Sequence, residues 1–131
     1  MKQRGGVVEG GFEGLSEFEK GLILGILIGE GHFGGDGKQP QITLKMNVRH
    51  EQLLRWLNDR VRWSRLYGPY HHDNRHYLQL MIRGPALRQE LAPMLNALPW
   101  AEIDDHSYAR FIEMLKRYGL LEEIVSRSGS T

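Results

Sequence analysis

The chain has 131 residues, the size of one domain, and 40% of them are hydrophobic, which is enough to form a core. It has no cysteine, which excludes disulfide bonds, zinc–thiolate sites and a cysteine nucleophile. Residues 1–37 hold three bases and six acids, a net charge of −3. Residues 38–88 hold ten bases and three acids (+7), and residues 89–131 hold four bases and seven acids (−3). This basic middle favours one positive, nucleic-acid-binding surface, although the same charges could simply solvate separate faces.

No targeting or membrane segment is expected. The start, Met-Lys-Gln-Arg-Gly-Gly, is not followed by the apolar core of a signal peptide, and the longest apolar run, residues 22–28, is too short to span a bilayer. Residues 1–14 contain five glycines and no apolar periodicity, which predicts a flexible tail. We therefore expect a protein of the cytoplasm or an organellar matrix, neither secreted nor inserted in a membrane.

The first predicted element is a helix with signals at both ends. Ser16-Glu17-Phe18-Glu19 matches a capping box, in which the serine hydroxyl and the second glutamate satisfy each other's backbone N–H groups. An apolar stretch continues to Glu30, and Gly31 is suited to end the helix. The expected helix therefore spans about residues 16–30.

Two features of this helix point to function. Glycines recur every fourth residue, so they lie on one side and allow another backbone to approach closely; they are Gly21, Gly25 and Gly29. Glu30 lies at the C-terminal end, where the helix dipole disfavours a carboxylate and the last backbone carbonyls lack partners. An acid there is better placed to hold a cation than to stabilise the helix.

Two strands are expected next. Residues 33–38 are short and glycine-rich, which predicts a strand and turn. Residues 41–47 alternate with a period of two, so that Ile42, Leu44 and Met46 face a core.

The remaining pattern predicts a second helix over residues 50–61, strands over 64–71 and 75–83, a helix from Gly84-Pro85 to about residue 95, and a last helix over 104–118. The order is αββαββαα. We expect an α+β fold in which a four-stranded antiparallel sheet carries helices on one face.

The second face of this sheet would be polar, aromatic and basic, and no further element remains to cover it. Such a face suits contact with a nucleic-acid groove, while an ordinary solvent-facing sheet is the alternative interpretation. The residues expected to contact DNA are His32, Gln41, Thr43, Lys45, Asn47, Arg65, Tyr67, His71, Arg75, Tyr77, Gln79 and Arg83.

Residues 23–31, Ile-Leu-Gly-Ile-Leu-Ile-Gly-Glu-Gly, resemble the motif of the LAGLIDADG homing endonucleases, and residues 16–120 follow that family's order of elements. The resemblance implies a saddle-shaped sheet and one such domain over residues 15–120, with tails at 1–14 and 121–131. It also implies that Gly25 and Gly29 are packing positions and that Glu30 binds divalent metal.

The chain has one such motif, so a working site would require a homodimer, with Gly21, Gly25 and Gly29 at the interface. The resemblance then implies Mg²⁺ or another divalent metal held by Glu30 and the carbonyl of Gly29, with Lys45 as a second catalytic residue. The expected partner is double-stranded DNA with a pseudo-palindromic site, which the dimer would cleave by phosphodiester hydrolysis.

Two departures from the family motivate an alternative. A polar residue that relatives often carry on the second strand corresponds to Leu44, and no lysine occurs between Lys45 and Lys116, where many relatives have one. The alternative function is a catalytically weak or inactive DNA-binding regulator of the same fold. A dimerising structural protein without a nucleic-acid partner is the third hypothesis.

Overall fold

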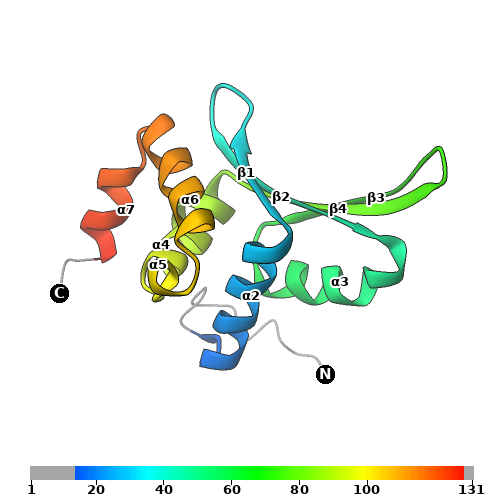
Figure 1. Ribbon diagram of the computed structural model, residues 1–131, viewed down its shortest axis with the longest axis horizontal. Helices are drawn as coiled ribbons and strands as arrows, with labels where there is room; N and C mark the ends of the chain where they lie inside the picture. The colour runs from blue at the N-terminus through cyan, green and yellow to red at the C-terminus, as the bar shows by residue number, and fades with distance from the viewer. Residues whose placement is uncertain (1–13, 129–131) are drawn as a thin grey trace.

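The computed structural model describes residues 14–128, which form an α+β fold (Figure 1). Its centre is a four-stranded antiparallel sheet in the order β1-β2-β4-β3. The strands are β1 (Gly31–Gly35), β2 (Pro40–Asn47), β3 (Arg65–His72) and β4 (Arg75–Arg83). This confirms the predicted four-stranded antiparallel sheet.

The helices follow the predicted order with additional short pieces. They are α2 (Glu17–Glu30), η2 (Val48–His50), α3 (Glu51–Arg60), η3 (Ala86–Leu91), α4 (Ala92–Asn96), α5 (Trp100–Ile103), α6 (Asp105–Arg117) and α7 (Leu121–Ser128). In Figure 1, α2 and α3 lie beneath the sheet, and α4 to α7 gather beside its β1 edge. No helix in residues 14–128 is long and apolar enough to cross a membrane.

Helix α2 begins with the predicted capping box. The backbone N–H of Glu19 donates to Ser16 Oγ at 3.1 Å, and the backbone N–H of Ser16 donates to Glu19 Oε1 at 2.8 Å. At the other end, the N–H of Gly31 donates to the Leu27 carbonyl, and a Cβ on Gly31 would lie 2.7 Å from that oxygen. Gly31 is therefore required by close backbone approach, since its own φ of −77° suits any residue.

The sheet separates an apolar face from a polar one. Residues that face the helices are almost completely buried, as the alternation of the sequence predicted; they are Ile42, Leu44, Leu78, Leu80 and Ile82. Leu54 and Leu57 of α3 and Ile23 and Leu27 of α2 complete this core. Burying one such side chain is worth about 1.5–3 kcal/mol, so the core holds the sheet firmly against its helices.

Strand β3 contains a bulge that the sequence analysis did not anticipate. Tyr67 pairs with Gln79, but the next paired residue, Tyr70, is opposite Tyr77, so that Gly68 and Pro69 face a single residue of β4. Gly68 has a φ of +107°, a conformation that favours glycine. One extra residue reverses the alternation of every residue between the bulge and the turn.

Helix α6 is fixed to the edge strand β1 by an aromatic cluster. The ring of Phe33 packs on Trp100 and Phe111, with centroids 5.7 and 6.5 Å away, and Trp100 and Phe111 are themselves 4.7 Å apart. All three are buried. The cluster sets the position of α6 relative to the sheet.

The C-terminal part differs from expectation in two places. The helix expected from Gly84-Pro85 consists of a π-helix, η3, continued by α4, and a short extra helix, α5, precedes α6. Residues 121–128, which we assigned to a tail, form α7, with Leu120 and Ile124 buried. The apolar spacing of Leu120 and Ile124 explains this helix, because the two side chains lie on one side and enter the core. The N-terminal residues 1–13, also expected to be a tail, lie outside the described residues.

Candidate nucleic-acid interface

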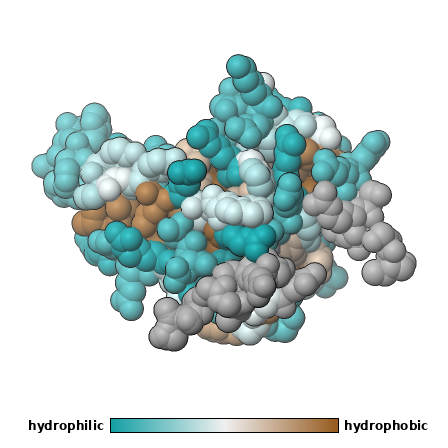
Figure 2. Space-filling view, turned by 180° about the vertical axis from the view of Figure 1, so that it is seen from behind, coloured by the Kyte–Doolittle hydropathy of each residue, from teal (hydrophilic) through white to brown (hydrophobic). Residues whose placement is uncertain are grey.

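The outer face of the sheet is polar and accessible to solvent. Its side chains are exposed or half-buried, and no described helix covers them (Figure 1). Seen from behind, the hydrophilic surface dips between the β3–β4 hairpin and the projecting β1–β2 turn (Figure 2). The strand register assigns to this face His32, Gln41, Thr43, Lys45, Asn47, Arg65, Tyr67, Tyr70, His72, Arg75, Tyr77, Gln79, Met81 and Arg83.

This face is positively charged because it carries Lys45, Arg65, Arg75 and Arg83, and none of the four strands contains aspartate or glutamate. The nearest acid of the β1–β2 turn, Asp36, accepts the backbone N–H groups of Gln39 and Lys38, each at 2.8 Å, and these bonds hold the pKa of Asp36 below its ordinary value. Lys45 lies over the ring of Tyr77, 5.8 Å from its centroid, beside a cavity of about 280 Å³ that Arg75 also lines. Cationic, amide and aromatic groups together suit phosphate and base edges.

The bulge changes which residues of β3 belong to this face. His71, which we expected to contact DNA, pairs with His76 on the opposite face, where their rings are 4.8 Å apart and their Nδ1 atoms 2.5 Å apart. Tyr70 and His72 take its place, and the Tyr70 ring lies 5.4 Å from that of Tyr77. Gly-Pro inside a strand was the signal for a bulge that the sequence analysis did not use.

Glu30 is the last residue of α2 and is exposed where the helix meets β1. Its carboxylate has no hydrogen bond or ion pair to any described residue. The carbonyl of Gly29, in the last helical turn, has no donor four residues ahead within its own helix. These oxygen atoms are ligands of the kind that hard divalent cations prefer. The described part of the chain contains no cluster of three or more potential metal ligands.

Lys45 lies at the level of Glu30 along the sheet. Gly31 pairs with Leu44, so the next residue of β2 is level with the end of α2. Leu44 is completely buried and faces the helices, whereas Lys45 is exposed on the outer face. The alternation of β2 is regular throughout its pairing with β4, so no bulge moves Lys45 from that position.

The glycine face of α2 is open. A Cβ added at Gly21, Gly25 or Gly29 would meet no atom within 4 Å outside its own helix. Phe18 and Leu22, on the same side of the helix, are 72% and 37% exposed, unusual values for such side chains. They line a groove of about 440 Å³ with Leu53 and Trp56 of α3. An apolar helix face with room for a neighbouring backbone is thus left uncovered by the described residues.

Comparison with solved structures finds the same arrangement in two DNA-bound enzymes. The first is the I-LtrWI LAGLIDADG homing endonuclease bound to target DNA, with a TM-score of 0.50 and 16% identity over 87% of this chain. The second is the meganuclease I-SmaMI bound to uncleavable DNA, with a TM-score of 0.53 and 13% identity over 91% of this chain. The fold is that of the LAGLIDADG homing endonucleases.

At these identities the likeness concerns the fold. The chain covers 43% of I-LtrWI and 46% of I-SmaMI, less than half of either neighbour. No protein-family model matches the sequence, and no curated protein matches it either.

Proposed function

We propose that this chain is the subunit of a homodimeric DNA endonuclease of the LAGLIDADG type. Two copies would pack through the glycine faces of α2, so that their two sheets form one continuous surface along a DNA duplex. A two-fold symmetric protein binds a pseudo-palindromic site most favourably. The chain covers 43% and 46% of the two solved neighbours, so a second domain of the same size would complete a unit of about their length.

The observation that carries this proposal is the position of Glu30. An exposed carboxylate without a protein partner ends the helix that bears the open glycine face, at the margin of a sheet surface free of acids. Within a dimer, two such carboxylates would lie close to the two-fold axis beneath the DNA. Two carboxylates so close together would repel each other unless a cation lay between them.

Glu30 and the Gly29 carbonyl fit a hard divalent cation such as Mg²⁺, because both offer oxygen ligands. When bound, such an ion supplies Lewis-acid stabilisation of the phosphate and lowers the pKa of an attacking water. Lys45, level with Glu30, would stabilise the negative charge that develops on the scissile phosphate. The cations, amides and aromatic rings of the outer face would hold the duplex in register.

The experiment is a cleavage assay on a DNA library with Mg²⁺, comparing the wild type with Glu30→Gln. We expect the variant to bind DNA but to cleave at least roughly a hundredfold more slowly, because a metal ion contributes several kcal/mol and each 1.36 kcal/mol is tenfold. EDTA should have the same effect on the wild type. Glu102→Gln, which removes an exposed acid of α5, is the control and should cleave normally. Cleavage that survives Glu30→Gln would refute the proposed site.

A second candidate is a DNA-binding regulator that retains the dimer and the sheet surface but not cleavage. Complete burial of Leu44 favours it, because that strand position then offers no polar group beside Glu30. Salt-dependent, sequence-selective binding without strand scission under any divalent metal would select the regulator. Absence of DNA binding at low salt would refute both candidates.

A further inference from the structure

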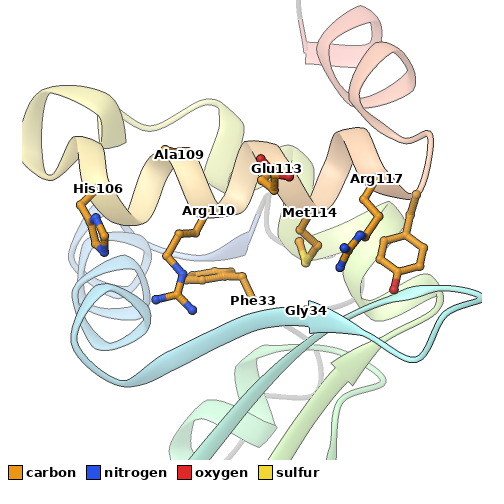
Figure 3. Close-up of a pocket in the computed structure, with 9 residues that line it drawn as sticks. Phe33, Gly34, His106, Ala109, Arg110, Glu113, Met114 and Arg117 are labelled. Carbon is orange, nitrogen blue, oxygen red and sulfur yellow. The ribbon is translucent and has the colours of Figure 1, made fainter.

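A second basic feature lies outside the outer face of the sheet. A cleft of about 300 Å³ separates α6 from the edge strand β1 (Figure 3). Helix α6 contributes three basic residues, His106, Arg110 and Arg117, and one acid, Glu113, and β1 contributes Phe33 and Gly34. None of the three basic residues belongs to the sheet surface described above.

The cleft is held open by fixed parts of the fold. Phe33 is anchored by the aromatic cluster under α6. At the far end, the Tyr118 ring lies so close to Gly35 that any side chain there would collide with it. The Tyr118 hydroxyl accepts the backbone N–H of Gly37 at 3.1 Å, which ties the end of α6 to the β1–β2 turn. The spacing between the basic side chains and the strand is therefore set before any ligand binds.

The basic residues of the cleft are available for a ligand. In Figure 3, His106, Arg110 and Arg117 extend from α6 toward β1, whereas the Glu113 carboxylate stays at the level of the helix. Arg110 and Arg117 are exposed, and neither forms an ion pair with a described residue. Residues 89–131 carry a net charge of −3, so a row of cations on one side of α6 is not a general property of that segment.

The length of the row distinguishes between anions. His106 and Arg117 are eleven residues apart, or about 16 Å along an α-helix. A single phosphate group would contact one end of this row. A nucleic-acid strand carries a phosphate about every 3.4 Å along its axis, so it can contact all three basic side chains at once. Guanidinium groups suit such phosphates because they donate paired hydrogen bonds.

The cleft also joins the outer face of the sheet. A Cβ on Gly34 would lie 3.1 Å from the His32 imidazole, so Gly34 and His32 share one side of β1. A strand of DNA lying on the sheet could therefore continue around the β1 edge at Gly34, which has no side chain, and reach the cleft. The imidazole of His32 lies beside Gly34 at this edge and so adds a polar group where the outer face meets the cleft.

We propose that the cleft between α6 and β1 binds the phosphodiester backbone of the DNA through Arg110, Arg117 and His106. This inference rests on the proposed function, because it extends the DNA contact from the sheet to the flank of the domain. The contact is independent of base sequence and adds affinity rather than specificity.

The test measures binding of the full chain to a labelled random-sequence DNA duplex over a series of salt concentrations. The double variant Arg110→Gln/Arg117→Gln should bind roughly tenfold more weakly at low salt, and the slope of log K against log salt should fall by about two, since each lost phosphate contact accounts for about 0.9. Lys116→Gln is the matched control, because Lys116 is an exposed cation of the same helix that does not line the cleft. Its slope should equal that of the wild type.

Three outcomes would overturn the inference. A double variant that binds DNA with an unchanged slope shows that the cleft makes no backbone contact, while the proposed endonuclease remains intact. Thermal stabilisation of the wild type, but not of the double variant, by inorganic phosphate at constant ionic strength, together with an unchanged DNA slope, would assign the cleft to a small phosphorylated ligand. Absence of all DNA binding would refute both proposals. Thermal unfolding of the double variant without ligand, expected to match the wild type, excludes misfolding.

Discussion

At the scale of single residues, the most constrained polar group is the indole N–H of Trp100. Trp100 is completely buried, and its N–H donates to Ser107 Oγ at 2.9 Å, itself in a residue that is only 5% exposed. Ser107 also lies in the first turn of α6, where its backbone N–H donates to the Asp104 carboxylate at 3.2 Å. The Ser107 side chain and this backbone N–H hold the pKa of Asp104 below its ordinary value. The Ser107 hydroxyl therefore accepts the buried indole N–H, and it belongs to the first turn of α6, the helix that lines the basic cleft.

Removing that hydroxyl should be costly. We expect Ser107→Ala to lower the free energy of unfolding by about 1–3 kcal/mol, because it leaves a buried donor without an acceptor. Urea denaturation measures this change. Trp100→Phe removes the donor instead. The double variant should lose less unfolding free energy than the sum of the losses in the two single variants. Strict additivity would show that the two groups do not depend on each other.

At the scale of elements, Glu19 connects the start of α2 to the end of α3. Its carboxylate accepts the backbone N–H of Ser16 and, at 3.0 Å, the guanidinium of Arg60, and the half-buried ion pair has side chains 20% and 16% exposed. The hydrogen bond from Ser16, followed by the bond and charge of Arg60, holds the pKa of Glu19 below its ordinary value. Deprotonated Glu19 therefore stabilises the fold.

This makes stability depend on pH in a defined direction. The contribution of Glu19 is complete above its unfolded pKa of about 4.3 and disappears as the pH falls through its lower folded value. We expect Glu19→Gln to be less stable than the wild type by about 1 kcal/mol at pH 7, with the difference closing below about pH 4. Glu17→Gln, at a side chain 89% exposed, is the control. A difference in unfolding free energy between Glu19→Gln and the wild type that stays constant down to pH 3 would contradict this role of Glu19.

The elements also show what could be read from the sequence. Capping at Ser16 and strict alternation in residues 41–47 and 75–83 specified their structures because local and tertiary preferences agree there. The π-helix η3 and the short α5 could not be predicted from the sequence, since they depend on contacts between distant segments. Helix η3 contacts β2 and β4, and Trp100 of α5 packs on Phe33. The cleft was missed for the same reason: Arg110 and Arg117 carry no motif, and only the fold brings them beside β1.

At the scale of the whole molecule, the exposed side of α2 has the properties of an interface. Glycines at every fourth position leave room for a second backbone, and Phe18 and Leu22 supply apolar area beside them. In a subunit that worked alone, glycines at three exposed helical positions would each cost up to about 1 kcal/mol relative to alanine. Close packing of two copies gives these glycines a physical reason.

Enlarging the central glycine tests this assembly. Because a side chain at Gly25 meets no atom within 4 Å outside its own helix, Gly25→Leu should leave the single subunit folded and slightly more stable. The same side chain would keep two helices apart. We expect the mass in solution to fall from that of two chains to that of one, 15.1 kDa, by sedimentation or light scattering.

Cleavage should be lost together with the dimer, whereas Ala101→Leu, at an exposed position of α5, should alter neither. A wild type that is monomeric at all working concentrations would contradict the proposed assembly, and so would a Gly25→Leu variant that remains a dimer.

The bulge in β3 has a consequence for protein engineering. Because Gly68 and Pro69 oppose one residue of β4, each side chain beyond them lies on the opposite face of the sheet from the one it would have in a regular strand. A library intended to alter base preference at the distal end of the binding site should therefore randomise Tyr70 and His72, while His71 and His76 stay constant. Deleting one residue at the bulge would bring His71 outward and so give a different recognition surface from an almost unchanged sequence.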